Sequence, residues 1–163
     1  MDNLIAVIPA AGAGKRLGLG INKAFAKINS VPLLVHCLTM LSRTKLITRA
    51  IVVLAPDEVE EGRELLVSYQ GTHFADLPFV VVAGGKERQD SVNNALAAII
   101  ESEGYVAVHD GARPFAGKEV FERTLLAAKE HGAAIAAVPV KDTIKVVNSD
   151  GEVTATPNRS TLY

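Results

Sequence analysis

Short apolar runs and amphipathic segments alternate along most of this chain. Runs rich in Val, Ile and Ala have the length of single strands at residues 4–8, 50–55, 79–83, 105–108 and 133–140. A continuous apolar run of this kind is typical of a strand that is buried on both faces. The pattern therefore predicts a sheet built from these five segments.

The segments between the strands have helical patterns. Ser30 precedes apolar residues at helical spacing, and Asp57 precedes an acidic stretch suited to a helix N-terminus. We therefore expect each of them to cap a helix. A further helix is expected within residues 87–101, where one apolar stripe is formed by Val92, Leu96 and Ile99.

Strands that alternate with helices need crossover connections, so neighbouring strands run parallel. We expect an α/β fold, a mainly parallel sheet flanked by helices, formed by one domain over residues 1–163. From Lys141 onward the pattern changes, because two β-rich runs flank the turn sequence Asn148-Ser149-Asp150-Gly151. An Asp-Gly turn predicts a β-hairpin, and residues 141–158 are expected to form a protruding arm.

The first strand runs into a loop of small residues, Pro9-Ala10-Ala11-Gly12-Ala13-Gly14-Lys15-Arg16-Leu17-Gly18. Glycines let the backbone approach a ligand and turn its N–H groups toward an anion, and Lys15 and Arg16 add positive charge. The loop does not match the dinucleotide fingerprint, whose third glycine would lie one residue before Gly18. It does not match a Walker loop either, because no Ser or Thr follows Gly14-Lys15. The loop therefore predicts a phosphate site without indicating its class.

Two further unusual loops follow strand ends, Gly84-Gly85 and His109-Asp110-Gly111-Ala112-Arg113-Pro114. Ligands of parallel α/β sheets bind beyond the C-terminal ends of the strands, so we expect these loops and the glycine loop to meet at one edge. Asp110 fits either a magnesium ligand or a turn residue, and its position beside Arg113 favours the metal. His109 fits a structural hydrogen bond better than an acid or base.

Charge is distributed unevenly along the chain. The net charge is −1, yet no Asp or Glu lies between Asn3 and Pro56. A small polyanion is a better ligand than nucleic acid, because aromatic residues make up 5% and Trp is absent from the sequence. No apolar run approaches the roughly 18 residues of a membrane span and no leader is recognisable, so we expect a cytoplasmic protein. The single Cys37 fits a buried core thiol better than a catalytic one.

Five segments spread over nearly the whole chain carry a family resemblance. They are the glycine loop with Lys23, Gly84-Gly85-Lys86-Glu87-Arg88-Gln89-Asp90-Ser91-Val92, Val108-His109-Asp110-Gly111-Ala112-Arg113-Pro114, Val138-Pro139-Val140-Lys141-Asp142-Thr143-Ile144-Lys145 and Thr156-Pro157-Asn158-Arg159-Ser160-Thr161-Leu162-Tyr163. In this order they resemble the 2-C-methyl-D-erythritol 4-phosphate cytidylyltransferase family. The resemblance implies a Rossmann-like nucleotidyltransferase fold and transfer of CMP from CTP to methylerythritol phosphate, with release of pyrophosphate, in non-mevalonate isoprenoid biosynthesis.

The resemblance also implies a role for individual residues. Arg16 and Lys23 would be the catalytic cations, and Asp110 would lie at a magnesium ion. The CTP site would be formed by Ala10, Ala11, Gly12, Gly14, Gly85, Ser91, Gly111 and Ala112. The acceptor would be held by Arg113, Thr143 and Arg159. Arg159 would reach into a partner's site, because the hairpin resembles the arm through which the family forms homodimers; no nucleic-acid or membrane partner is implied.

The reaction implied by the resemblance is an in-line attack by a phosphate oxygen on the α-phosphorus, which needs no protein nucleophile and no base. Two features depart from the family's pattern. Asn22-Lys23-Ala24 stands where the family usually has Pro-Lys-Gln, and the chain ends at Tyr163, so we expect a C-terminally incomplete member. The alternatives are a cytidylyltransferase for another polyol phosphate such as ribitol 5-phosphate, a CTP-binding module with little turnover, and a dehydrogenase, which the glycine spacing disfavours.

Overall fold

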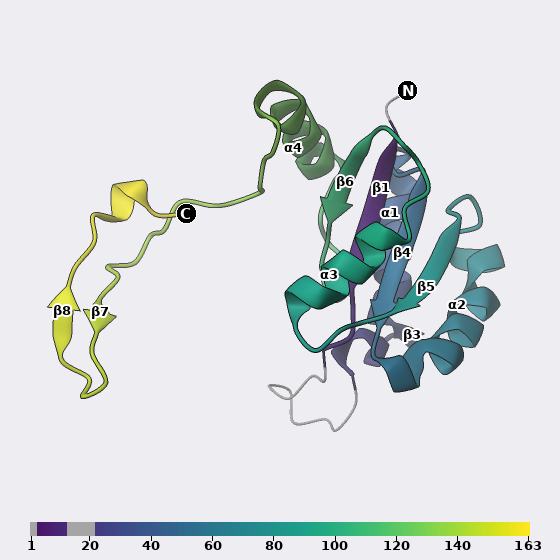
Figure 1. Ribbon diagram of the computed structural model, residues 1–163, viewed down its shortest axis with the longest axis horizontal. Coiled ribbons are helices and arrows are strands. Elements are labelled where there is room, and N and C mark those ends of the chain that lie inside the picture. Colours follow the sequence, from purple (N-terminus) through teal and green to yellow (C-terminus); the bar gives the residue numbers. More distant parts are fainter. Residues whose placement is uncertain (1–2, 13–21) are drawn as a thin grey trace. The chain divides into compact units, whose positions relative to one another are not determined.

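The computed structural model describes residues 3–12 and 22–163, which form two units, residues 1–125 and 126–163 (Figure 1). The main sheet of the first unit is formed by four strands, β1 (Leu4–Pro9), β4 (Arg49–Leu54), β5 (Phe79–Ala83) and β6 (Tyr105–Val108). They form one sheet in the order β5-β4-β1-β6, and every neighbouring pair runs parallel. The predicted α/β fold with a mainly parallel sheet is therefore confirmed.

Helices cover both faces of this sheet (Figure 1). On one face, buried leucines of α1 (Leu33–Thr44) and α2 (Val59–His73) pack with Ala6 and Ile8 of β1. On the other face, Ala95 of α3 (Arg88–Ala97) packs with Ile5 and Val7. Successive residues of β1 are thus buried on opposite faces, which explains why its sequence is continuously apolar.

Short elements connect the main ones. The turn η2 (Lys23–Phe25) leads to an antiparallel hairpin of β2 (Lys27–Ile28) and β3 (Val31–Pro32), and η3 (Pro56–Glu58) precedes α2. The helix α4 (Lys118–His131) follows β6. No helix in residues 3–12 and 22–163 is both long enough and apolar enough to cross a membrane.

Two expectations about helix N-termini are wrong. Ser30 caps no helix but lies with Asn29 in the β2–β3 turn, where both residues have positive φ, and α1 begins after Pro32 without a side-chain cap. Asp57 lies inside η3, and α2 follows Glu58, likewise without a side-chain cap. In each case the backbone takes a tighter local turn before the helix begins, and such turns also favour Asn, Asp and Ser.

The apolar stripe expected within residues 87–101 describes the buried face only in part: Ile99, just beyond α3, packs with the core and Val92 is half-buried. Ser91 and Ala95 are buried, whereas Leu96 is 43% exposed. The small side chains of Ser91 and Ala95 let the helix lie close to the sheet. A search for apolar residues at helical spacing misses a buried helix face whose side chains are small, such as serine and alanine.

The segment 133–140, predicted as a fifth strand, is not a strand. Ile135 and Val138 are 86% and 78% exposed, and the Val140 N–H donates a hydrogen bond to the Leu162 carbonyl at 3.0 Å. A strand exists only where a neighbour completes its hydrogen-bond ladder, and no described strand pairs with this segment. The apolar run indicated a segment able to form a strand, but it could not show whether a neighbouring strand is available to pair with it.

The second unit contains the predicted hairpin. Its strands β7 (Val146–Val147) and β8 (Val153–Ala155) pair antiparallel. In the turn, the Asn148 side-chain oxygen accepts hydrogen bonds from the N–H groups of Asp150 and Glu152, at 3.1 and 2.9 Å. Gly151 has a φ of 84°, a conformation that glycine adopts without strain. The Asp-Gly turn between β-rich runs is confirmed.

Cys37 lies in α1 and is fully buried, which confirms that it is a core thiol. Its Sγ is 3.9 Å from the Asp110 carbonyl oxygen. Burial, and after it the negative charge of Asp110, raise the pKa of the Cys37 thiol from 9.0 to about 12.

Cys37 is therefore expected to make the protein less stable in alkali. The folded state binds the thiol proton more tightly than the unfolded state, so the contribution of Cys37 is complete below pH 9.0 and is lost as the pH rises toward about 12. Within that window the loss grows with each pH unit. Urea unfolding of the wild type and of Cys37→Ala, measured at neutral pH and across the window, should show the difference between them shrinking; a constant difference would contradict this account.

Candidate active site

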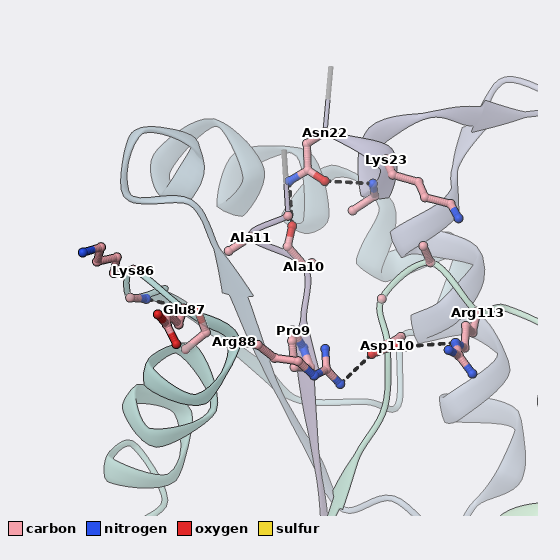
Figure 2. A pocket seen from close by; sticks show the side chains of 16 residues that line it. Pro9, Ala10, Ala11, Asn22, Lys23, Lys86, Glu87, Arg88, Asp110 and Arg113 are labelled. Atoms are coloured by element: carbon pink, nitrogen blue, oxygen red, sulfur yellow. Dashed lines mark hydrogen bonds and ion pairs between the residues drawn. The ribbon is translucent and has the colours of Figure 1, made fainter. Parts of the chain in front are cut away.

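A cavity of about 720 Å³ lies beyond the C-terminal ends of β1, β5 and β6, entirely within the first unit (Figure 2). Its lining comes from the loop after β1, from η2 with the residue before it, from the loop between β5 and α3 with Ser91, and from the loop after β6. The lining residues lie in the ranges 9–12, 22–24, 85–88 and 110–113 and at Ser91. The expected meeting of three loops at one sheet edge is confirmed.

Close packing leaves little room for a side chain at Gly84, Gly85 and Gly111, and at Gly85 a Cβ would clash with the Asp90 Cβ. A Cβ on Gly84 would lie 2.9 Å from both the Ala11 Cβ and the Ser91 Oγ. A Cβ on Gly111 would lie 3.0 Å from the Ala10 Cβ. The loops therefore touch through backbone and small side chains, which leaves the cavity open above them.

The N-terminus of α3 forms one wall of the cavity. Glu87 and Asp90 form a capping box, in which the Glu87 N–H donates to the Asp90 carboxylate at 2.9 Å. Ser91 in the same turn is 4% exposed, and its hydroxyl oxygen accepts a hydrogen bond from the Gly85 N–H at 3.1 Å. The capping box and Ser91 together fix the backbone between β5 and α3.

Asp110 connects two arginines across the cavity. Its Oδ1 accepts from the Arg88 Nη2 at 2.7 Å and its Oδ2 accepts from the Arg113 Nε at 2.9 Å. Figure 2 shows the two guanidinium groups approaching Asp110 from opposite sides. With Lys23 and Lys86, the described lining contains four cationic side chains against the carboxylates of Glu87 and Asp110. This balance suits a polyanionic ligand.

The carboxylates at the site limit how a magnesium ion could be bound there. No group of three or more His, Cys, Asp or Glu side chains that could hold a metal occurs among residues 3–12 and 22–163. Magnesium is commonly bound by one or two carboxylates together with the phosphates of a substrate and water. With two carboxylates among the described lining residues, and both oxygens of Asp110 already paired with arginines, the site fits a magnesium ion that enters with a phosphate ligand and displaces one of these arginines from Asp110.

His109 has the structural role expected of it. Its Nε2 is 2.9 Å from the Arg113 carbonyl oxygen, and its ring centroid lies 5.4 Å from that of Phe121. The hydrogen bond and the ring contact hold the loop after β6 in place.

The cavity contains most of the site residues that the sequence indicated. Those that line it are Ala10, Ala11, Gly12, Lys23, Gly85, Ser91, Asp110, Gly111, Ala112 and Arg113. Gly14 and Arg16 lie outside the described residues. Thr143 and Arg159 belong to the second unit, where the Arg159 Nη1 donates to the Lys141 carbonyl at 2.8 Å. The roles of these residues stay predictions.

Sequence reasoning gave no role to six of the lining residues, of which Asn22, Lys86 and Arg88 have hydrogen-bond donors in their side chains. Lys86 and Arg88 follow the Gly84-Gly85 pair directly, so their position after a strand end was a usable signal. Asn22 had a weaker signal, because Asn is a common residue immediately before a helical turn.

The parallel sheet with a cationic cavity at the ends of its strands defines an α/β protein of the nucleotidyltransferase fold class. The sequence pattern of one family, described as 2-C-methyl-D-erythritol 4-phosphate cytidylyltransferase, matches residues 4–163. The chain belongs to this family.

Individual relatives give the extent of the similarity. A 2-C-methyl-D-erythritol 4-phosphate cytidylyltransferase of Bacillus thuringiensis is 45% identical over 156 residues, which cover 96% of this chain and 66% of the relative. The enzyme of the same name from Geobacter metallireducens is 42% identical, and the match covers 68% of its length. The crystal structure of a 4-diphosphocytidyl-2C-methyl-D-erythritol synthase from Anaerococcus prevotii matches with a TM-score of 0.79 and 31% identity, over 99% of this chain and 67% of that one. The chain thus spans about two thirds of the length of the relatives it matches.

The hydrogen bond at Ser91 yields a prediction about stability. Ser91→Ala leaves the Gly85 N–H without its partner, and we expect a loss of about 1 kcal/mol in the free energy of unfolding. The matched control is Ser68→Ala on α2, whose exposed hydroxyl donates to the Leu65 carbonyl. Urea titrations of both variants should show a clear loss for Ser91→Ala and little change for Ser68→Ala; equal losses would mean that the Gly85 contact adds nothing.

Proposed function

We propose that the protein is a cytoplasmic cytidylyltransferase that transfers CMP from CTP to 2-C-methyl-D-erythritol 4-phosphate and releases pyrophosphate. The observation that carries the proposal is the meeting of the expected nucleotide-binding residues in one cationic cavity. Family membership over residues 4–163 supports it, and so does the name that the relatives share. The chain spans about two thirds of the length of those relatives, so its own activity has to be measured directly.

In this proposal the backbone of Ala10, Ala11, Gly12 and Gly14 receives the triphosphate, and the cytidine lies against Gly85, Ser91, Gly111 and Ala112. Arg16 and Lys23 lie beside the reacting phosphates. Arg113 binds the acceptor phosphate together with Thr143 and Arg159. Arg159 comes from a partner subunit, in a homodimer formed through the hairpin 141–158.

The chemistry needs position and charge more than acid or base groups. An acceptor phosphate oxygen attacks the α-phosphorus in line, the new P–O bond forms, and the bond to the bridging oxygen of pyrophosphate breaks. Negative charge grows on the α-phosphate and on the leaving pyrophosphate, where Lys23 and Arg16 stabilise it. Magnesium bound to the phosphates, with Asp110 as one ligand, would neutralise part of the same charge.

Pyrophosphate release tests the proposed function directly. With CTP and magnesium, we expect release with 2-C-methyl-D-erythritol 4-phosphate to exceed release with ribitol 5-phosphate, tested in parallel. A preference for ribitol 5-phosphate would replace the acceptor. No release with either, combined with a rise in melting temperature on adding CTP and magnesium, would show a nucleotide-binding protein without turnover.

Lys23→Ala tests the cation at the reacting phosphates. Removing one electrostatic donor to the transition state costs about 2–4 kcal/mol, so we expect kcat/KM to fall about thirtyfold to a thousandfold. Lys118→Ala is the matched control, because Lys118 is exposed, pairs with Glu122 and does not line the cavity. A fall of less than about tenfold in Lys23→Ala would exclude this role for Lys23.

A further inference from the structure

Asn22 is a buried polar residue at the edge of the cavity, directly before Lys23. Asn22 is 6% exposed, and every hydrogen-bonding group of its side-chain amide has a partner. The Nδ2 donates to the Ala10 carbonyl at 2.6 Å, and the Oδ1 accepts from the Ala24 N–H at 3.0 Å (Figure 2). The Nδ2 also donates to the Glu58 Oε2 at 2.7 Å. One amide therefore joins three segments of the chain.

These three hydrogen bonds have different consequences. The bond from the Ala24 N–H caps η2, the turn whose first residue is Lys23. The bond to Ala10 ties that turn to the loop after β1, and the bond to Glu58 ties it to the segment before α2. The bond to Glu58 is charge-assisted and therefore the stronger kind. The turn that carries Lys23 is thus fixed from two directions.

We propose that Asn22 is a positioning residue that acts through Lys23, which rests on the proposed function. The loop after β1 and Lys23 both line the cavity, and both would bind the same triphosphate. Asn22 holds their backbones at a fixed separation before the ligand arrives. An error of about 1 Å in such a position can cost about a hundredfold in rate, so a residue that touches no ligand can still control turnover.

The chemistry of this position accounts for asparagine in particular. Aspartate would place a second carboxylate against Glu58 and would lose both donated hydrogen bonds. Serine would keep an acceptor that can cap η2 but would lose the links to Ala10 and Glu58. Asn22→Ser therefore removes the links between segments while it preserves the local turn, which makes it the better test variant than Asn22→Ala.

A double-mutant cycle on the full chain tests the inference. The variants are Asn22→Ser, Lys23→Ala and the double variant, with Thr44→Ala as control. Thr44 is 3% exposed and makes two hydrogen bonds at the end of α1, so its loss removes a comparable buried polar group away from the cavity. The measured quantities are kcat and KM for pyrophosphate release, together with the melting temperature.

We expect Asn22→Ser to lower kcat by about tenfold or more in the wild type, and by less than about twofold when Lys23 is already alanine. Thr44→Ala should lower the melting temperature without changing kcat. If Asn22→Ser lowers kcat by the same factor with and without Lys23, or leaves kcat unchanged in the wild type, Asn22 has only a structural role and the inference is wrong.

Failure of the proposed function gives a different result. If the wild type and Thr44→Ala both release no pyrophosphate, calorimetric binding of CTP with magnesium provides the readout for the same cycle. Affinity that falls in Asn22→Ser only while Lys23 is present would support the positioning role without turnover. If the wild type does not bind the nucleotide, the proposed function is wrong and the inference is overturned with it.

Discussion

Parallel pairing of β1 with β4 and β6 is the constraint on which the cavity depends. Parallel strands end at the same edge of a sheet, so the loops that follow them leave the sheet side by side. The central position of β1 brings its loop between the loops that follow β5 and β6. Residues separated by about a hundred positions in the sequence, such as Ala10 and Gly111, therefore come into contact.

Hydrogen bonds extend this pairing beyond the strands and into the cavity wall. The Ala10 N–H donates to the Val53 carbonyl at 2.8 Å, and the Gly84 N–H donates to the Leu54 carbonyl at 2.7 Å. The Gly111 N–H donates to the Pro9 carbonyl at 3.3 Å. At Ala10, Gly84 and Gly111 the backbone beside the cavity is thus held by the same ladder as the core, so these positions have little conformational entropy left to lose on binding.

Polar and charged side-chain contacts hold the cavity wall in addition to the backbone hydrogen bonds. Asp110 orients Arg88 from α3 and Arg113 from its own loop, and Asn22 orients the turn of Lys23. Guanidinium groups that are already held by a carboxylate lose less side-chain freedom when a phosphate binds. The described part of the site is therefore held at two levels, by backbone pairing and by polar contacts, of which those of Asn22 are buried while the side chains of Arg88 and Arg113 are exposed.

The sequence by itself determined the sheet, its parallel direction, the edge at which the cavity lies and most of the residues that line it. The strands, their direction and the edge follow from local patterns, because apolar runs, helical spacing and glycines after strand ends each depend on neighbouring residues. Most of the lining residues were instead implied by the family resemblance. Only the tertiary structure decided that residues 133–140 form no strand, that Ser91 and Ala95 form the buried face of α3, and that Asp110 pairs with two arginines. It also decided that Asn22, next to a lysine the sequence singled out, joins the loop after β1 to Glu58. Apart from the pairing of Asp110 with Arg113, which is only three residues away, each of these depends on a partner distant in sequence, and no local pattern shows which partner the fold supplies.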